Sequence, residues 1–224
     1  MSVLNRLLRA PAEVAAACRE DRDVREIAAA SIASLALGAA VFGGTIGSFR
    51  GGVQILYAGL KLPIALLATL AVCAPAFHGL AAGLGRPMPM RVLLALTLAS
   101  AGRAALVLLA LAPGLWLLLD LGVGYHAAAL AAALAYGLAG VAALGILLRG
   151  LGDAPHRGIT ALAFGLVFFA VAGQASWILR PYLVRPRTTG VPFVRAREGS
   201  FADSLYLSSR SARGVYDNAE VTEP

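Results

Sequence analysis

Three charged side chains stand within or beside long apolar stretches, where a charge is costly unless it is paired or hydrated. They are Lys61, Arg103 and Asp120. Charged residues in such positions line solute paths in transporters, but they also mark the ends of membrane-spanning helices. For Lys61 and Asp120 we favour the helix end, because each stands at the boundary of an apolar stretch and its side chain can reach the membrane surface.

Arg103 has two interpretations. If its helix begins at residue 92, the arginine lies near mid-depth and is a functional candidate. If the span covers residues 104 to 121 instead, Arg103 and Asp120 mark its two interfaces. They cannot pair along one unbroken helix, because seventeen residues at 1.5 Å each separate them by about 25 Å. We therefore expect backbone carbonyls, water or a lipid phosphate near the membrane surface to satisfy Arg103.

The remaining reactive side chains predict no catalytic or metal site. His78 and His126 lie within apolar stretches, and neither has a carboxylate or cysteine at ligand spacing. We interpret both as hydrogen-bonding core residues and expect no metal and no cofactor. The settings of Cys18 and Cys73 predict two free thiols. Since the chain has no HExxH, GxSxG, Walker-type glycine loop or cysteine cluster, we expect no catalytic residue and no enzyme.

Long apolar stretches must position these side chains. Hydrophobic residues make up 59% of the 224 residues and charged residues only 14%, too few to cover a soluble globular surface. A bilayer core of about 30 Å needs about 20 apolar residues in a helix. The sequence therefore predicts an all-α, polytopic membrane protein with about five transmembrane helices, at residues 27–47, 62–84, 92–119, 126–148 and 158–179. Pro63 is expected at the start of the second helix.

Two polar segments flank this transmembrane bundle of residues 27–182. Residues 1–26 combine leucine and valine with arginine, which predicts an amphipathic helix on the membrane surface or a short solvated helix. Residues 183–224 form a basic polar tail that predicts irregular structure. The net charge of +7 is not gathered into a stripe with stacking aromatics, so we expect contact with membrane lipids and none with nucleic acid.

The arginines of the short loops predict the orientation. Five spans with a cytoplasmic N-terminus gather most of them inside but leave the tail's arginines outside. Four spans would bring the tail inside and export Arg86, Arg91, Arg149 and Arg157. We favour five. The abundance of arginine beside a single lysine, with much alanine, leucine and glycine, suggests a GC-rich bacterial genome and hence the bacterial inner membrane.

Small residues recur at four-residue spacing, which lets membrane helices approach closely. Such faces predict packing within the chain, self-association or contact with another subunit. The residues are Ala39, Gly43, Gly47 and Gly51 in the first group, Gly79 and Gly83 in the second, and Ala129, Ala133 and Gly137 in the third.

The chain combines five spans, a cytosolic-type N-terminal segment and the turn LGRPMPMRVLLALTLAS between the second and third spans. In this combination it resembles the Yip family of five-span membrane proteins and its bacterial relatives. The resemblance covers about residues 50–150. Eukaryotic members carry a Tyr-Gly-Pro motif, whereas Tyr57 and Pro63 stand here at another spacing, so no functional residue is transferred. The resemblance implies membrane organisation without catalysis. The sequence thus predicts an accessory or assembly subunit of a membrane complex, or alternatively a small transporter or channel lined by Lys61, Arg103 and Asp120.

Overall fold

The computed structural model describes residues 2–85, 87–152 and 156–179. This part of the chain is all-helical, and five of its helices are long and apolar enough to cross a membrane. The prediction of an all-α multi-pass membrane protein is confirmed, whereas the expected irregular tail lies outside the described residues. The helices are α1 (Val3–Arg9), α2 (Pro11–Arg19), α3 (Val24–Ser48), α4 (Val53–Gly83), α5 (Met90–Asp120), α6 (Tyr125–Gly150) and α7 (Arg157–Leu179).

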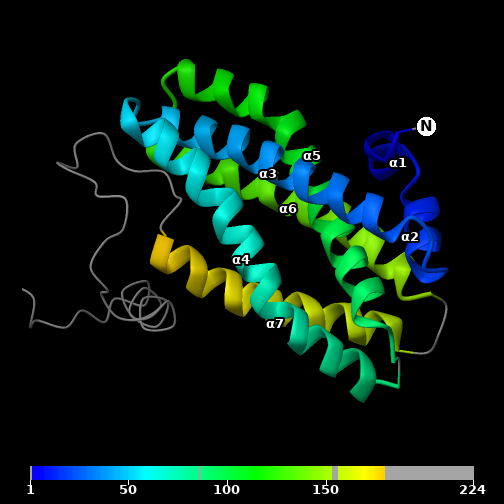
Figure 1. The fold of residues 1–224 in the computed structure, drawn as a ribbon. Coiled ribbons are helices and arrows are strands. Elements are labelled where there is room, and N and C mark those ends of the chain that lie inside the picture. Colours follow the sequence, from blue (N-terminus) through cyan, green and yellow to red (C-terminus); the bar gives the residue numbers. More distant parts are fainter. Residues whose placement is uncertain (1, 86, 153–155, 180–224) are drawn as a thin grey trace, which may run out of the picture.

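Glycines in the left-handed region join the spanning helices. Gly51 and Gly52 have φ of 80° and 61° between α3 and α4, a conformation that costs other residues about 1–2 kcal/mol. Gly85, Gly122 and Gly152 also have positive φ in the next three turns. One end of the bundle, which we call the basic end, holds α1, α2, the carboxyl ends of α4 and α6 and the amino ends of α3, α5 and α7 (Figure 1).

The second spanning helix begins earlier than the sequence predicts. The expected start was residue 62, but α4 begins at Val53, and Pro63 lies in its interior together with Pro75. The prediction that Pro63 starts the helix is therefore wrong. The glycine turn has already ended α3, so the apolar residues after it join α4, and a membrane helix tolerates an interior proline when neighbouring groups satisfy the freed carbonyl.

Helix α5 lies at the centre of the bundle. It packs against α3 and α6, α3 also packs against α4, and α7 packs mainly on α4 (Figure 1). The buried share of the most apolar stretch differs between helices. It is 61% for α5, 28% for α6 and 17% for α7. Helices α6 and α7 therefore turn most of their apolar surface outward.

Glycines allow α3 to approach both of its neighbours closely. An added Cβ would lie well under 3.0 Å from the Ala105 backbone of α5 at Gly38, and equally close to the Ala58 carbonyl oxygen of α4 at Gly43. At Gly47 the nearest carbonyl oxygen of α4 would be 2.5 Å away. The Ala- and Gly-rich composition of this span is thus what allows it to pack between two helices.

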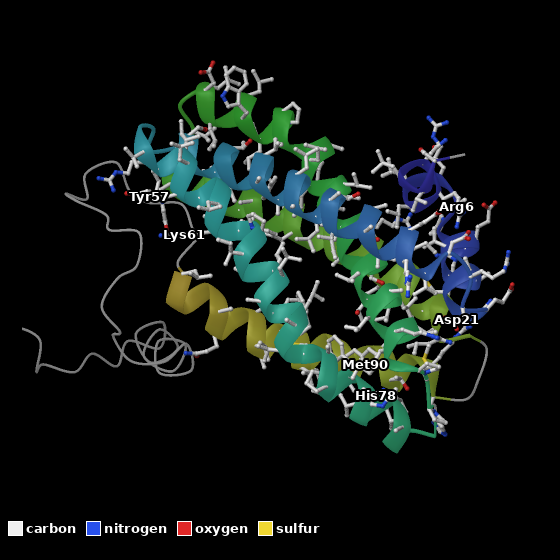
Figure 2. The ribbon with its side chains drawn as sticks, viewed as in Figure 1. Arg6, Asp21, Tyr57, Lys61, His78 and Met90 are labelled. Atoms are coloured by element: carbon white, nitrogen blue, oxygen red, sulfur yellow. The ribbon has the colours of Figure 1, made fainter. Side chains whose placement is uncertain are left out.

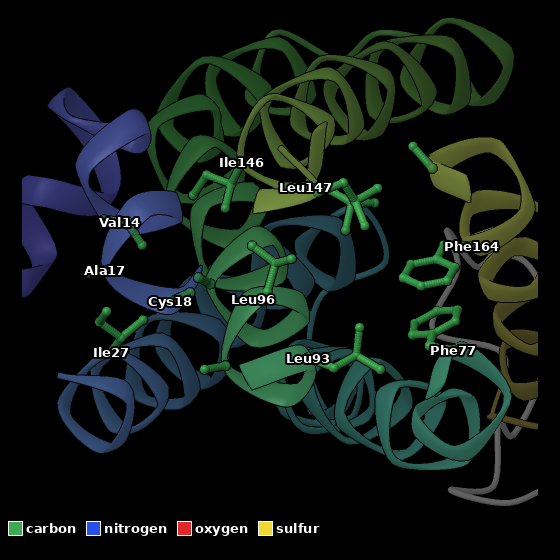
Figure 3. Close-up of a cluster of buried hydrophobic side chains, with 14 of the residues drawn as sticks. Val14, Ala17, Cys18, Ile27, Phe77, Leu93, Leu96, Ile146, Leu147 and Phe164 are labelled. Carbon is green, nitrogen blue, oxygen red and sulfur yellow. The ribbon is translucent and has the colours of Figure 1, made fainter. Parts of the chain in front are cut away.

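Buried side chains of the N-terminal helices and of α4, α5, α6 and α7 form one hydrophobic cluster at the basic end (Figure 3). Leu93 and Leu96 of α5 lie between Cys18 of α2 on one side and α4 and α7 on the other. The rings of Phe77 and Phe164 stack there with centroids 4.5 Å apart. This stack joins α7 to α4.

Candidate functional site

The three charged residues predicted within or beside the spans lie in different surroundings. Lys61 is buried in the interior of α4, 2% exposed, with its Nζ 5.8 Å from the centroid of the Tyr57 ring. Figure 2 shows this pair at the end of the bundle away from Arg6. Arg103 is half-buried within α5, and Asp120 is the exposed last residue of that helix.

Contacts along α3 measure how far apart the lysine and the arginine lie. Gly59, close to the lysine on α4, packs against Ala40, whereas Gly102, next to the arginine on α5, packs against Ser31. Nine residues of α3 separate these two levels, about 13 Å at the helical rise. The two cations therefore do not share one level of the bundle.

Helix α5 keeps Arg103 and Asp120 apart. It is continuous through Pro113, so the two charges stand about 25 Å apart along one axis. This separation is close to the roughly 30 Å thickness of a hydrocarbon core. The separation is compatible with two residues at opposite membrane surfaces, which stays a prediction, and it excludes an ion pair between them.

The histidines do not converge on a ligand site. Within the described ranges, no group of three or more His, Cys, Asp or Glu residues could hold a metal ion. His78 is half-buried in α4, and its Nδ1 has no hydrogen-bond partner among the described residues. His126 belongs to the first turn of α6, but its side chain lies outside the described residues.

Among the described residues, the first of the predicted small-residue faces is the one whose glycines pack against another helix. Ala39 is fully buried, and Gly43 and Gly47 lie against the α4 backbone. Gly51 belongs to the turn instead.

The two other small-residue faces point away from the bundle. A Cβ added at Gly79, Gly83 or Gly137 would meet nothing within 4 Å. Ala129 is half-buried and Ala133 is exposed. No described residue covers the glycines of these two faces.

Close contacts at four other glycines were missed from the sequence. They occur at Gly38, Gly59, Gly102 and Gly150, where an added Cβ would meet a facing helix. Gly150, for example, leaves room for the Leu96 side chain. Because none of these glycines belongs to the predicted four-residue repeats, only the high glycine content of the apolar stretches hinted at them.

The N-terminal helices pack onto the basic end of the bundle. Leu7, Val14 and Cys18 are fully buried in the core that α5 and α6 contribute to. On the other face, Leu4 and Leu8 remain 46% and 44% exposed. The amphipathic segment thus buries one apolar face on the bundle and exposes two leucines. The contact of this segment with a membrane surface stays a prediction.

Two ion pairs connect the N-terminal segment and the turn after it to neighbouring helices. Arg6 lies 3.3 Å from Asp23 at the start of α3, and Asp21 pairs with Arg91 at the start of α5. Arg6 and Asp21 mark this region in Figure 2. Both aspartates have positive φ in the turn between α2 and α3, so the turn directs their carboxylates toward separate helices.

Both cysteines are free, as predicted, and both are buried. Burial raises the pKa of the Cys18 thiol to about 11, although nearby Arg6 lowers it in part. The thiol therefore stays protonated at neutral pH and is a packing group rather than a nucleophile. Cys73 points its Sγ at the Val167 carbonyl oxygen of α7, 4.0 Å away.

A groove of about 330 Å³ opens at the basic end. Among the described residues its lining contains one charged group, Arg19, whose Nη1 donates a hydrogen bond to the Arg149 carbonyl oxygen at 3.0 Å. The other lining residues offer no acid, base or nucleophile, and they are Pro87, Met88, Pro89, Val92, Gly150 and Leu151.

No protein-family model, curated protein or solved structure matches this chain. The resemblance to the Yip family accordingly rests on the sequence patterns alone. The exposed faces and the placement of charges in this multi-pass membrane protein are the observations from which its function is inferred.

Proposed function

We propose that this chain is a non-enzymatic accessory subunit that assembles with another membrane protein in the bacterial inner membrane. The observation that carries the proposal is the outward face of α6. A Cβ at Gly137 or Gly140 would meet nothing within 4 Å, and Ala133 on the same face is exposed. Lipid requires no small residues, whereas a partner helix uses them to bring two backbones close.

Helix α3 already packs closely against another helix of this chain through small residues. Its Gly43 and Gly47 lie against the backbone of α4. Helix α6 has glycines of the same kind, but the described residues supply no helix to cover them. A transmembrane helix of another subunit is the occupant with the matching chemistry, because it offers the same apolar surface and backbone contact that α4 offers to α3.

A transport path is less well supported. A charge-lined path requires its charged groups to face one cavity, but the groove at the basic end is lined by none of Lys61, Arg103 and Asp120. The sequence also lacks the motifs of the common reaction classes. Assembly is therefore better supported than either transport or catalysis.

We place the basic end in the cytoplasm. In the described part of the chain, this end carries most of the arginines of the helix ends and short turns, among them Arg19, Arg25, Arg91 and Arg149, while Arg50 is in the turn at the other end. Arginine-rich short segments remain on the cytoplasmic side during insertion.

Gly137→Leu should lower the yield of a co-purifying membrane subunit about tenfold, because the leucine would hold the partner helix away and cost about 1.4 kcal/mol or more of binding. The chain is purified from bacterial membranes in mild detergent, and intact masses identify the associated chains. Gly114→Leu is the matched control, since Gly114 also has nothing within 4 Å but lies on α5.

Equal recovery of the partner with both variants would contradict the proposal that α6 is the interface. A parent chain that purifies without any stoichiometric partner, and that carries solute flux in liposomes which Arg103→Leu abolishes, would favour the transporter alternative. Recovery of a second copy alone would indicate self-association.

A further inference from the structure

Two arginines from different helices converge above a single glycine. An ideal Cβ on Gly145 of α6 would lie 3.2 Å from Nη1 of Arg149 and 3.4 Å from Nη1 of Arg103 of α5. The Arg149 Nη1 also donates a hydrogen bond to the Gly145 carbonyl oxygen at 2.7 Å. Both guanidinium groups therefore lie over bare backbone, and a side chain at this position would displace them.

No carboxylate of the described residues neutralises this arginine pair. The ion pairs within those ranges occupy Glu20, Asp21 and Asp23 with other arginines. The carboxyl end of α6 supplies only about half a negative charge, against the two full positive charges of Arg103 and Arg149. The two cations repel each other, and the repulsion is stronger at a membrane boundary than in water. A bound anion would reverse that balance.

The surroundings indicate which anion reaches the pair. Arg149 is exposed one residue before the end of α6, at the basic end. Toward the membrane centre, the same face of α6 exposes Val141, Leu138 and Leu134 by 68%, 58% and 62%, since residues three and four apart share a helix face. An apolar strip thus leads from the two charges into the hydrocarbon.

We propose that Arg103 and Arg149 bind the phosphate of an anionic phospholipid, with one acyl chain along this strip. Arginine guanidinium groups recognise phosphate through paired, charge-assisted hydrogen bonds, and basic pockets between membrane helices bind lipid headgroups. A soluble phosphate would use the charges but not the apolar strip. The two guanidinium groups lie about two helical turns from Gly137, although Leu134 and Val141 of the strip border the partner surface on α6.

The test uses the full chain, phosphatidylglycerol and phosphatidylcholine in equal amounts, and native mass spectrometry of the retained lipid. The parent should prefer phosphatidylglycerol about tenfold, the effect of one charge-assisted hydrogen bond or more. Arg103→Gln with Arg149→Gln should lose that preference. Gly145→Leu should also lose it, although both charges remain. Arg9→Gln with Arg25→Gln is the matched control, because both residues are exposed at the same end.

Loss of preference to the same extent in the control pair would overturn the site, because general charge would then explain the binding. If the Arg103→Gln and Arg149→Gln chain does not fold, Gly145→Leu decides, and an unchanged preference in it contradicts the site. Displacement of phosphatidylglycerol from the parent by millimolar inorganic phosphate would identify a soluble phosphate as the ligand and overturn the lipid assignment.

Discussion

Replacing Gly43 with alanine should destabilise the bundle by about 3 kcal/mol. The added Cβ would lie against the backbone carbonyl of Ala58, so no change of rotamer relieves the clash and α3 must move away from α4. Close packing, rather than the hydrophobic effect, holds helices together in lipid. The free energy of reversible unfolding by sodium dodecyl sulfate in mixed micelles measures the loss.

Gly79→Ala is the matched control for this change. It adds the same methyl group to α4 at a place where nothing lies within 4 Å. Alanine favours a helix over glycine by up to about 1 kcal/mol, so this variant should be unchanged or slightly more stable. Equal unfolding free energies for Gly43→Ala and Gly79→Ala would contradict the packing of α3 on α4.

Phe164→Ala should release α7 from the bundle, at a cost of about 3 kcal/mol. Phe164 is 1% exposed and stacks on Phe77, and α7 has few other helices to hold it. Cys73 reports the release, because it is fully buried and its Sγ faces the Val167 carbonyl oxygen of α7. In a Cys18→Ala background, N-ethylmaleimide should modify Cys73 at least about tenfold faster in the Phe164→Ala variant than in the parent, because the lost packing makes opening of α7 more frequent.

Phe169→Ala is the matched control, because it removes the same aromatic ring from α7 at a place where the ring is largely exposed. Phe169 lies on the same helix but is 74% exposed, so its removal should leave the rate at Cys73 unchanged. If Phe164→Ala leaves Cys73 as unreactive as Phe169→Ala does, the Phe77 stack does not hold α7.

The sequence predicted the five spanning helices because whether a helix can cross a bilayer depends mainly on its length and its lack of charge. It misplaced the start of α4, because a proline before an apolar run also resembles a helix start. The structure places Pro63 well inside the helix, where only tertiary surroundings decide whether a proline is tolerated. Helix boundaries therefore depended on information that local patterns do not contain.

The candidate sites were predictable to differing degrees. The sequence already excluded an ion pair between Arg103 and Asp120 on one unbroken helix, because their separation follows from helical rise alone. The meeting of Arg103 with Arg149 did not follow, since it depends on the register between α5 and α6. The burial of α2 was also unpredictable, because an amphipathic pattern shows that one face is apolar but not whether lipid or protein covers it.

The side of the membrane on which each end lies tests the account most directly. Single cysteines replace Ser2, Leu121 or Ser209 in a chain that carries Cys18→Ala and Cys73→Ala, and an impermeant maleimide is applied to spheroplasts or inverted vesicles. Leu121 is 71% exposed after α5. Five crossings predict that Ser2→Cys reacts only in inverted vesicles and that Leu121→Cys and Ser209→Cys react only in spheroplasts. Labelling of Ser2→Cys and Ser209→Cys from the same side would contradict five crossings.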